Sequence, residues 1–420
     1  MKNILLIGSG GREHAISLKL IESKNVNKLY VIPGNPGISK IAECYDIDIL
    51  DNSKLLDFAK EKNIDLVVVG PEGPLANGIV DFFQDHKIQI FGPNKQAAMF
   101  EASKSFSKNF MIRYNIPTGF FKEFINFKDA KNYIEEKGMP IVIKADGLAA
   151  GKGVLVAFNK EDAIDFARDC LENKLFGESS SKIIVEEFLD GEEGSYLLFL
   201  DSKSYIPMVH SQDHKQIFDG DKGPNTGGMG AYSPANVFKD NEEELREIVN
   251  NFLRGIEIEN IDYKGVLYIG LIKTKDGLKV LEFNCRFGDP ETQVILPRMK
   301  SDLIEIIECV INENLSKIKI EWAEESCACV VLSSKGYPGK YVAGKMITGL
   351  DRVTKSQVIH AGTKEKDGFL VTNGGRVLNV VATGSNLKEA IDKIYADISK
   401  IYFEGIYYRK DIGYKGLNNN

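Results

Sequence analysis

The first hundred residues alternate short apolar segments with segments in which apolar residues recur every three or four positions. Continuous apolar segments predict buried strands, and the helical spacing predicts amphipathic helices. The expected strands are 2–8, 28–33, 65–70 and 87–92, and the expected helices are 13–23, 53–62 and 78–86. This alternation predicts a doubly wound parallel sheet, in which ligands bind at the carboxyl ends of the strands. Glycine-containing loops follow three of the strands: Gly8-Ser-Gly-Gly11, Pro33-Gly-Asn-Pro-Gly37 and Gly70-Pro-Glu-Gly73.

The pattern changes after residue 101. Residues 101–326 mix helical and strand patterns, beginning with a helix expected over 95–114, and contain glycine-rich loops at 146–153 and 220–230. Residues 327–420 predict short strands and one helix at 387–401, with Asn386 as its N-terminal cap and Glu389 three residues later. We therefore expect a multidomain α/β and α+β fold, with domains at 1–101, 102–326 and 327–420.

Composition places the chain among ordinary globular proteins, with 43% hydrophobic and 27% charged residues in a length of 420. A formal net charge of −7 disfavours a broad nucleic-acid-binding surface. No apolar segment approaches the roughly 20 residues of a membrane span, and the N-terminal one is too short for a signal peptide. The six scattered cysteines give no disulfide or zinc pattern, and Cys327 and Cys329 are expected to be buried on one side of a strand. We expect a reduced, cytoplasmic protein without nucleic-acid or membrane partners.

The first glycine loop, Gly8-Ser-Gly10, has the position of a dinucleotide-binding loop but not its full pattern. Glu13 stands where the third glycine belongs, and the second strand ends near Tyr30 without the carboxylate that would hold a ribose. A strand, a glycine loop and a helix start can still hold one phosphate through backbone N–H groups. A phosphate or sugar-phosphate contact is therefore favoured, a tight structural turn is the alternative, and a dinucleotide site is disfavoured.

The second glycine loop joins two expected strands and carries Lys144, Gly147, Gly151, Lys152 and Gly153. It is not a Walker A loop, because its glycines are too close and Gly153 replaces the magnesium-binding Ser or Thr. Such a loop can close over a ligand as a lid, with Lys144 placed to neutralise a phosphate. The alternative is a mobile hairpin with solvated lysines.

An acidic strand end follows at Glu186 and Glu187, continued by Phe188 and Leu189. Backbone groups and apolar side chains of such a segment can hold an adenine ring, and Glu193 can accept hydrogen bonds from ribose hydroxyls. Acidic strand ends are common, so this motif is weak by itself.

Glu282, Asn284 and Arg286 alternate with apolar residues at the end of an expected strand, so their side chains share one face. A carboxylate and an amide oxygen are hard ligands suited to Mg²⁺, which usually completes its shell with water and nucleotide phosphates. The guanidinium of Arg286 can form a bidentate pair with a carboxylate or phosphate. The alternative is a polar strand end at the surface.

Together, the lid, the adenine segment and the Glu-x-Asn pair resemble the ATP-grasp fold. The finer motifs resemble the phosphoribosylamine–glycine ligase family of purine synthesis, in order along essentially the whole chain. They are Gly8-Ser-Gly-Gly-Arg-Glu-His14, Pro33-Gly-Asn-Pro-Gly37, Lys144-Ala-Asp-Gly-Leu-Ala-Ala-Gly-Lys-Gly153, Gln212-Asp-His-Lys215, Asn225-Thr-Gly-Gly-Met-Gly-Ala-Tyr232 and Asn284-Cys-Arg-Phe-Gly-Asp-Pro-Glu291. The resemblance implies a Rossmann-like N-terminal substrate domain, a central ATP-grasp domain with a lid at about 120–190, and a small C-terminal domain.

The resemblance also implies a reaction, in which ATP converts glycine to glycyl phosphate and 5-phosphoribosylamine attacks it to give glycinamide ribonucleotide, ADP and phosphate. ATP and Mg²⁺ or Mn²⁺ are the implied cofactors. A monomer is implied, with at most a transient contact with the preceding pathway enzyme. The implied nucleotide contacts are Lys104, Lys144, Gly147, Gly151, Gly153, Glu186, Glu187, Phe188, Leu189 and Glu193. The implied metal ligands are Glu282 and Asn284, the implied catalytic residues are Lys144, Asp213 and Arg286, and the implied substrate contacts are Gly10, Gly11, Asn35, Asp213, Arg286 and Asp289.

Some assignments remain open. Some ATP-grasp relatives carry a further acidic metal ligand on the preceding strand, whereas residues 265–272 contain no acid. His214 is interpreted as structural or substrate-adjacent rather than as a general base, and Arg376 as either a substrate contact or a structural residue. The competing functions are another ATP-grasp acid–amine ligase or carboxylase, a nucleotide-sensing scaffold and, least favoured, a nicotinamide-dependent oxidoreductase.

Overall fold

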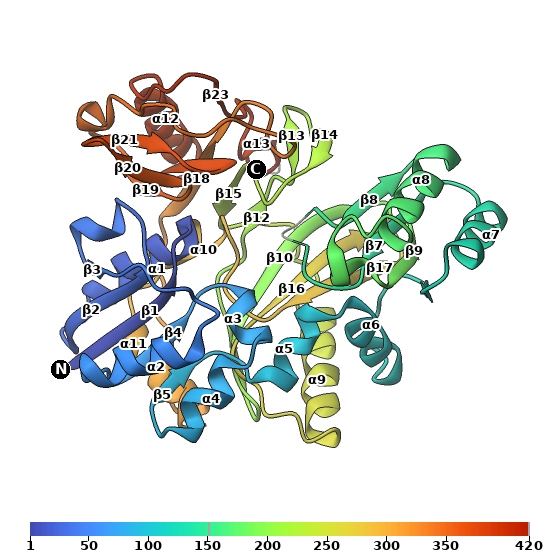
Figure 1. Ribbon diagram of the computed structural model, residues 1–420, viewed down its shortest axis with the longest axis horizontal. Helices are drawn as coiled ribbons and strands as arrows, with labels where there is room; N and C mark the ends of the chain where they lie inside the picture. The colour runs from blue at the N-terminus through green and yellow to red at the C-terminus, as the bar shows by residue number, and fades with distance from the viewer. Residues whose placement is uncertain (150–151, 419–420) are drawn as a thin grey trace.

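The computed structural model describes residues 1–149 and 152–418. Figure 1 shows the N-terminal part in blue at the lower left, the C-terminal part in orange and red above it, and a separate green and teal unit at the right. The central sheet runs between them. This arrangement brings distant segments of the chain to one place in the middle of the molecule.

The N-terminal part is a five-stranded parallel sheet in the order β3-β2-β1-β4-β5, which confirms the predicted sheet. Alternate residues of β1 enter two cores, because Ile4 and Leu6 pack on the α1 and α11 side while Leu5 and Ile7 pack on the α2 and α4 side. The short edge strand β3 and helix α3 were not predicted. The elements are β1 Lys2–Gly8, α1 Gly11–Ile21, β2 Val26–Pro33, η1 Ile38–Lys40, β3 Glu43–Cys44, α2 Asn52–Glu61, β4 Leu66–Val69, α3 Glu72–Ala76, α4 Ile79–Asp85 and β5 Gln89–Phe91.

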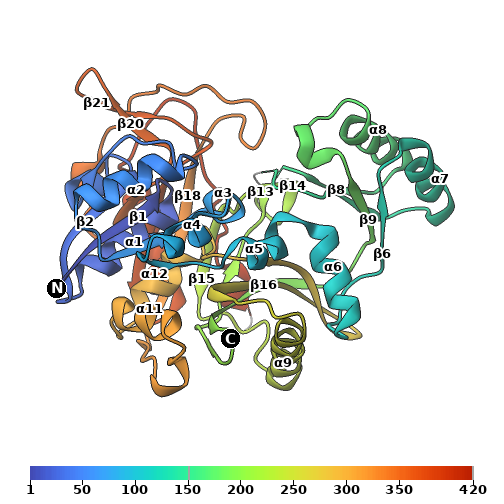
Figure 2. The same ribbon diagram turned by 60° about the horizontal axis from the view of Figure 1, so that its bottom comes forward.

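The central antiparallel sheet has the order β11-β10-β16-β17. Helices α5, α6 and α9 contact β17, and α11 contacts β10 and β16, so the sheet is covered by helices (Figure 2). Phe100, Phe110, Phe252 and Phe283 form an aromatic cluster beneath β17. The elements are α5 Lys95–Ala102, α6 Lys104–Arg113, β10 Glu192–Asp201, β11 Tyr205–Pro207, α9 Glu242–Ile258, β16 Lys264–Thr274, β17 Gly277–Asn284, α10 Thr292–Ile295, η3 Leu296–Arg298, α11 Leu303–Ile311 and η4 Leu315–Lys317.

The single helix expected over 95–114 is wrong, because the chain breaks into α5 and α6 at Ser103. The backbone of Ser103 is extended, and its Oγ accepts a hydrogen bond from the N–H of Phe106 as the cap of α6. The Ser103 hydroxyl also donates to Asp146 (3.1 Å), and Asp146 accepts from the N–H of Ser105 (2.6 Å). These hydrogen bonds to Asp146 hold the start of α6 against the glycine loop. Lys104, the first residue of α6, therefore lies beside that loop.

The lid is a four-stranded sheet in the order β6-β9-β7-β8, with α7 and α8 on one face and its own apolar core. Strands β7 and β8 are antiparallel and flank the glycine loop, as the strand–loop–strand pattern predicted. Gly151 of that loop lies outside the described residues. The elements are β6 Phe121–Phe124, α7 Phe127–Lys137, β7 Ile141–Ala145, β8 Val154–Ala157, α8 Lys160–Leu171, η2 Gly177–Ser180 and β9 Ile183–Glu187.

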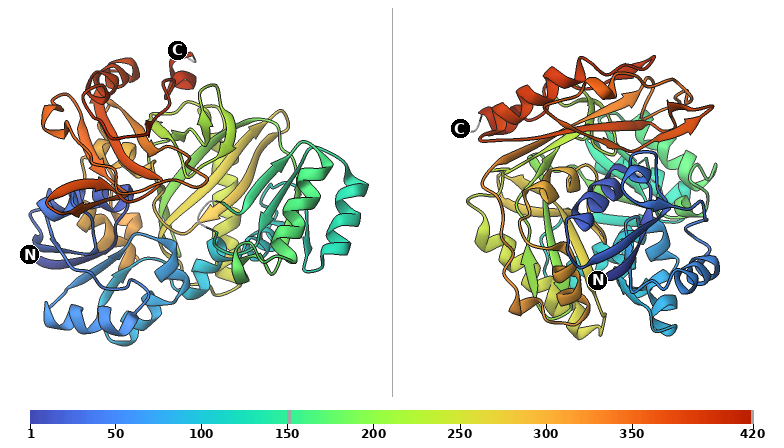
Figure 3. Two further views of the ribbon diagram at one scale, coloured as in Figure 1. Left: turned by 45° about the horizontal axis from the view of Figure 1, so that its top comes forward. Right: turned by 90° about the vertical axis from the view of Figure 1, so that its left-hand side faces the viewer.

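The C-terminal part shares a sheet with the central region, in the order β12-β15-β18-β22-β19 with β23 beside β18 (Figure 3). Helix α12 ends three residues before its expected end, but its predicted cap is confirmed, since Asn386 accepts from the N–H of Glu389 (3.0 Å). Cys327 and Cys329 lie in one core cluster, as predicted, and all six cysteines are free thiols. The elements are β12 Gln212–Asp213, β13 Gln216–Phe218, β14 Lys222–Asn225, β15 Gly230–Ser233, β18 Ser326–Ser334, η5 Leu350–Arg352, β19 Gln357–His360, β20 Thr363–Lys366, β21 Phe369–Thr372, β22 Arg376–Gly384, α12 Leu387–Ile398, β23 Ile406–Tyr407 and α13 Tyr414–Asn418.

Within the described residues, none of the helices has the length and the apolar composition that a membrane crossing needs.

Candidate active site

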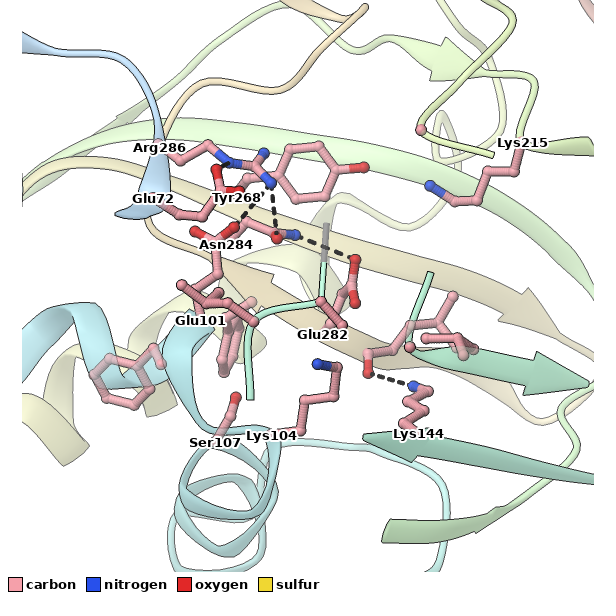
Figure 4. A pocket seen from close by; sticks show the side chains of 18 of the residues that line it. Glu72, Glu101, Lys104, Ser107, Lys144, Lys215, Tyr268, Glu282, Asn284 and Arg286 are labelled. Atoms are coloured by element: carbon pink, nitrogen blue, oxygen red, sulfur yellow. Dashed lines mark hydrogen bonds and ion pairs between the residues drawn. The ribbon is translucent and has the colours of Figure 1, made fainter. Parts of the chain in front are cut away.

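A cavity of about 350 Å³ lies where the N-terminal part, the central sheet, the lid and the C-terminal part meet (Figure 4). Its walls are strongly charged, and both signs are present. The cations are Lys104, Lys108, Lys144, Lys215, Arg12, Arg286 and Arg376, and the carboxylates are Glu72, Glu101, Glu186, Asp213, Glu282, Asp289 and Glu291. Such a cavity suits an anionic ligand together with a cation.

Two lysines approach the cavity from the lid side. Lys104, the first residue of α6, donates to the carbonyl oxygen of Gly147 (3.1 Å) and points toward Glu282 in Figure 4. Lys144, on β7, donates to Glu186 (3.1 Å). Burial, together with the charge of Lys144, lowers the pKa of Lys104. Gly153 also lines the cavity and Gly147 contacts Lys104, so the predicted phosphate lysines and two described glycines of the loop lie close together.

The predicted alternation at the end of β17 and just beyond it is confirmed. Asn284 donates to Glu282 (3.3 Å) and accepts from Arg286 (3.2 Å), while Phe283 and Cys285 enter the core on the opposite side. Burial opposes ionisation of Glu282, but Lys144, Lys215 and Lys104 hold its pKa below the ordinary value. The carboxylate is therefore charged at neutral pH.

The Glu282–Asn284 pair has the donor chemistry of a site for a hard metal ion. Glu282 and Asn284 offer one carboxylate and one amide oxygen, which are the hard ligands that Mg²⁺ and Mn²⁺ accept. Gly270 lies opposite Glu282 on β16, so that strand adds no acid. Among residues 1–149 and 152–418, no cluster of three or more His, Cys, Asp or Glu side chains forms a ready metal cage. The donor set fits a hard cation that completes its shell with water and phosphate oxygens.

Arg286 is held by two carboxylates that were not predicted. Its guanidinium lies 2.8 Å from Glu101 and 3.4 Å from Glu72. Burial raises the pKa of Glu101 to about 7, opposed by Arg286 and reinforced by Glu72. Glu72 follows the Gly70-Pro loop at the end of β4, so the strand-end rule gave a signal for it. Glu101 carried no signal, because it lies within an ordinary helical pattern.

Asp213 and Lys215 form an ion pair (3.0 Å) on the wall of the cavity opposite the lid lysines Lys104 and Lys144. Lys215 belongs to the Gln212-Asp-His-Lys215 motif but was not predicted as a site residue, although its spacing of two from Asp213 places both on one face. Nearby, Glu291 accepts hydrogen bonds from Tyr268 (3.0 Å) and Ser195 (3.0 Å). This wall presents acceptors and one ammonium group to a small polar ligand.

His214 is turned away from the cavity. Its Nε2 accepts from the N–H of Gly413 (2.9 Å), its Nδ1 lies 3.7 Å from Asp221, and it is 0% exposed. Burial lowers its pKa, although Asp221 opposes the effect. The geometry supports the structural interpretation of His214.

A second cavity of about 1050 Å³ adjoins the lid and is lined by both apolar and polar residues. Phe188, Leu189 and Glu193 line it, together with Val154 and Phe158 of the lid. Burial, with the nearby charges of Asp213 and Glu282, raises the pKa of Glu193, although Lys215 opposes the effect.

The two acidic residues before Phe188 point elsewhere. The side chain of Glu186 lines the first cavity, where it contacts lysines, and Glu187 forms an ion pair with Lys279 (3.1 Å). Of the predicted adenine segment 186–189, Phe188 and Leu189 therefore line the second cavity, as does Glu193, the predicted ribose contact.

In the first glycine loop, side-chain carboxylates of the protein accept hydrogen bonds from backbone N–H groups. Glu13 is buried, accepts from the N–H of Gly10 (2.6 Å) and pairs with Arg12. Asp289 accepts from the N–H of Arg12 (3.3 Å). Two donors at the start of α1, the N–H groups of Gly10 and Arg12, are thus engaged within the protein. Arg12 and Asp289 line the first cavity, and Gly10 does not.

Gly11 and Asn35 also lie outside the lining of the first cavity. A Cβ at Gly11 would lie 2.5 Å from the side chain of Asn379, so this glycine allows close packing. The amide of Asn35 donates to the carbonyl oxygens of Ser9 (2.8 Å) and His360 (3.0 Å). Asn35 therefore holds the loop, and its predicted substrate contact stays a prediction.

Arg376 brings the C-terminal part to the first cavity. It donates to the carbonyl oxygens of Gly227 (2.6 Å) and Asp289 (2.7 Å), and it lies 3.4 Å from the Asp289 carboxylate. Its place in the lining is compatible with both interpretations offered by the sequence, a substrate contact and a structural role.

Three family models together match most of the chain. Residues 2–101 match the N domain of phosphoribosylglycinamide synthetase, residues 102–292 its ATP-grasp (A) domain, and residues 327–415 its C domain. A phosphoribosylamine–glycine ligase of Halalkalibacterium halodurans is 50% identical over 99% of this chain and 97% of its own length.

Solved structures agree with this result. The crystal structure of the phosphoribosylamine–glycine ligase of Thermotoga maritima has a TM-score of 0.86 at 33% identity, covering 98% of this chain and all of that one (100%). The biotin carboxylase domain of the 2-oxoglutarate carboxylase of Hydrogenobacter thermophilus, solved with MgADP, has a TM-score of 0.74 at 15% identity, covering 97% and 91%, and supports the ATP-grasp fold alone. The chain belongs to the phosphoribosylglycinamide synthetase family.

Proposed function

We propose that this chain catalyses the ATP-dependent ligation of glycine to 5-phosphoribosylamine, giving glycinamide ribonucleotide, ADP and phosphate in purine biosynthesis. The observation that carries the proposal is the cavity in which Lys104, Lys144 and Lys215 surround the Glu282–Asn284 pair. The full-length similarity to phosphoribosylamine–glycine ligases supports the choice of substrates.

The nucleotide spans the two cavities in this proposal. The phosphates lie in the charged cavity near Lys104 and Lys144, beneath the loop that carries Gly147, Gly151 and Gly153. Adenine and ribose lie in the second cavity against Phe188, Leu189 and Glu193, with backbone groups at Glu186 and Glu187. The apolar residues in the lining of the second cavity and the cavity's contact with the lid support this orientation.

Glu282 and Asn284 would hold Mg²⁺ or Mn²⁺, which when bound neutralises phosphate charge and orients the phosphate oxygens. The lysines add cationic charge from the protein itself. This matters because the glycine carboxylate and the γ-phosphate are both anionic and repel each other.

The ligation proceeds in two steps. A carboxylate oxygen of glycine attacks the γ-phosphorus as the bond to ADP breaks, which gives glycyl phosphate. The amine nitrogen of phosphoribosylamine then attacks the acyl carbon, the bond to phosphate breaks, and the nitrogen releases one proton to solvent or to the departing phosphate. Water would hydrolyse the acyl phosphate, so closure of the glycine loop protects it.

The substrates occupy the wall opposite the lid lysines. Asp213 and Arg286 are proposed to contact glycine and the sugar phosphate, with Asp289 beside them. Gly10, Gly11 and Asn35 are proposed to approach the phosphoribosyl group through the N-terminal loops. The division into domains at 1–101, 102–326 and 327–420 is part of the same proposal, as are the monomeric state, the cytoplasmic location and a transient contact with the preceding enzyme.

Glycine labelled with ¹⁸O in its carboxylate tests the chemistry directly. Attack of the carboxylate on the γ-phosphate predicts one ¹⁸O atom in the released phosphate, with the other retained in the amide product. Mass spectrometry of the phosphate measures the transfer. Label in AMP, together with pyrophosphate release, would contradict the proposal because it indicates an acyl adenylate.

A further inference from the structure

Behind Lys144 lies a buried group of three charged side chains, Lys108, Glu186 and Lys144. Both lysine Nζ atoms lie 3.1 Å from the same oxygen, Oε2 of Glu186. The other oxygen of Glu186, Oε1, is buried and has no hydrogen-bond partner among the described residues. The three side chains are 2–8% exposed, so solvent screens their charges weakly.

Lys108 is fixed in place by the protein. It lies one helical turn after Lys104 on α6, so both point to the same side. Its Nζ donates to Thr118 (2.7 Å), whose hydroxyl donates onward to the carbonyl oxygen of Val280 (2.7 Å). This chain of hydrogen bonds anchors Lys108 between the helix and β17.

The charge of the group follows from its members. Burial opposes ionisation of Glu186, but Lys144 and Lys108 hold its pKa below the ordinary value. Glu186 and Glu282 outweigh the burial of Lys144 and raise its pKa. Burial lowers the pKa of Lys108 only to about 8, so it is charged at neutral pH. Two cations and one anion leave a net charge of +1.

Without Lys108, Lys144 and Glu186 would form a neutral pair, and this buried group would lose its net positive charge. We propose that Lys108 is a positioning residue that neutralises Glu186, so that the charge of Lys144 remains available to nucleotide phosphates. This inference rests on the proposed ATP-dependent function and adds to it a residue that acts through Glu186.

The test compares charge-altered variants by calorimetric titration with ATP and Mg²⁺ at pH 7. Lys108→Met is expected to raise the Kd for ATP about tenfold or more, while the KM for glycine changes little. Lys108→Met combined with Glu186→Gln removes one cation and one anion, so the net charge returns to +1. That double variant is expected to bind ATP within about threefold of wild type.

Lys131→Met is the matched control, since Lys131 on α7 has a side chain that is 43% exposed and lies 3.9 Å from Glu135. Its Kd for ATP is expected to equal that of wild type. If the double variant binds ATP as weakly as Lys108→Met, Lys108 contacts the phosphates directly and the inference is wrong. An unchanged Kd in Lys108→Met would also overturn it.

If Lys108→Met does not fold, the single variant Glu186→Gln provides a second test of the inference. This variant leaves both lysines and removes the anion, so it is expected to bind ATP at least as tightly as wild type. Weaker binding by tenfold would show that Glu186 is needed for another reason and would contradict the inference. A wild-type chain that does not bind ATP would overturn the proposed function as well, whereas normal wild-type binding with a failed charge test overturns this inference alone.

Discussion

At the residue scale, the Glu282 carboxylate lies among Lys104, Lys144 and Lys215, which stabilise its charged form. Glu282→Ala removes the anionic oxygen proposed for the metal. Loss of an outer partner of a metal ligand already costs about 10- to 100-fold, so we expect ADP formation to fall at least about 100-fold. The chain should stay folded by circular dichroism. Turnover like that of the surface control Glu161→Ala would contradict the metal assignment.

Asp213 is expected to act on the substrates rather than on the nucleotide, because it pairs with Lys215 on the wall opposite the lid lysines. Asp213→Asn should raise the KM for glycine or phosphoribosylamine about tenfold, since a charge-assisted contact is lost. The Kd for ATP should not change. Steady-state kinetics with each substrate varied, alongside calorimetry, separate the two effects. Unchanged kinetics for both substrates would remove Asp213 from the site.

The sequence predicted those site residues that a period of two or a strand end places together. Glu282 and Asn284 lie at the end of β17, and Arg286, two residues past the strand, contacts Asn284, so the three side chains lie together as expected. Glu101 could not be predicted, because it meets Arg286 only through packing of α5 against β17. The role of Glu186 was also missed, since its contact with Lys108 depends on how α6 meets β9.

At the element scale, two helix caps are expected to stabilise the fold, and one of them also positions a residue of the active site. Ser103→Ala and Asn386→Ala each remove a capping oxygen, so each should lower the free energy of unfolding by about 1 kcal/mol. Only Ser103 caps the helix that begins with Lys104 and is bound to the glycine loop through Asp146. Ser103→Ala should therefore also raise the KM for ATP, whereas Asn386→Ala should not. Urea unfolding and kinetics test both; equal KM values for ATP would contradict the role of the cap.

The break at Ser103 also shows what periodicity misses. Apolar residues continue through 95–114 with helical spacing, so one helix was expected. The serine side chain competes for backbone hydrogen bonds and starts a new helix. The two-residue strand β3 and the five-residue helix α3 were missed because they are too short to establish a period.

At the scale of the whole molecule, the N- and C-terminal parts meet at two buried histidines. The N–H of His360 donates to Nδ1 of His14 (2.9 Å), and the ring centroids lie 5.8 Å apart. Burial, with the charge of Lys40, lowers the pKa of His14 to about 4. Burial, with His14 and Lys40, lowers that of His360 to about 3. This contact could not be predicted, because 346 residues separate the two histidines along the chain.

Both histidines stay neutral in the folded chain but take up protons in the unfolded chain below about pH 6.5. The free energy of unfolding should therefore fall as the pH drops from 6.5 toward 4, by up to about 1.4 kcal/mol per pH unit for each histidine. His14→Asn should make this slope shallower, and the exposed His86→Asn should not. Urea unfolding between pH 7 and 5 measures the slopes. Equal slopes in wild type and His14→Asn would contradict the assignment.

The central claim is that the chain ligates glycine to phosphoribosylamine in the charged cavity, whose walls come from all parts of the chain. The most direct test is ADP release with ATP, Mg²⁺ and glycine, with and without phosphoribosylamine generated in place from ribose 5-phosphate and ammonia. We predict sustained ADP release only when both substrates are present, with glycinamide ribonucleotide identified by mass. Absence of turnover with this pair, and turnover with another acid and amine, would contradict the substrate assignment while leaving the fold and the phosphoryl transfer in place.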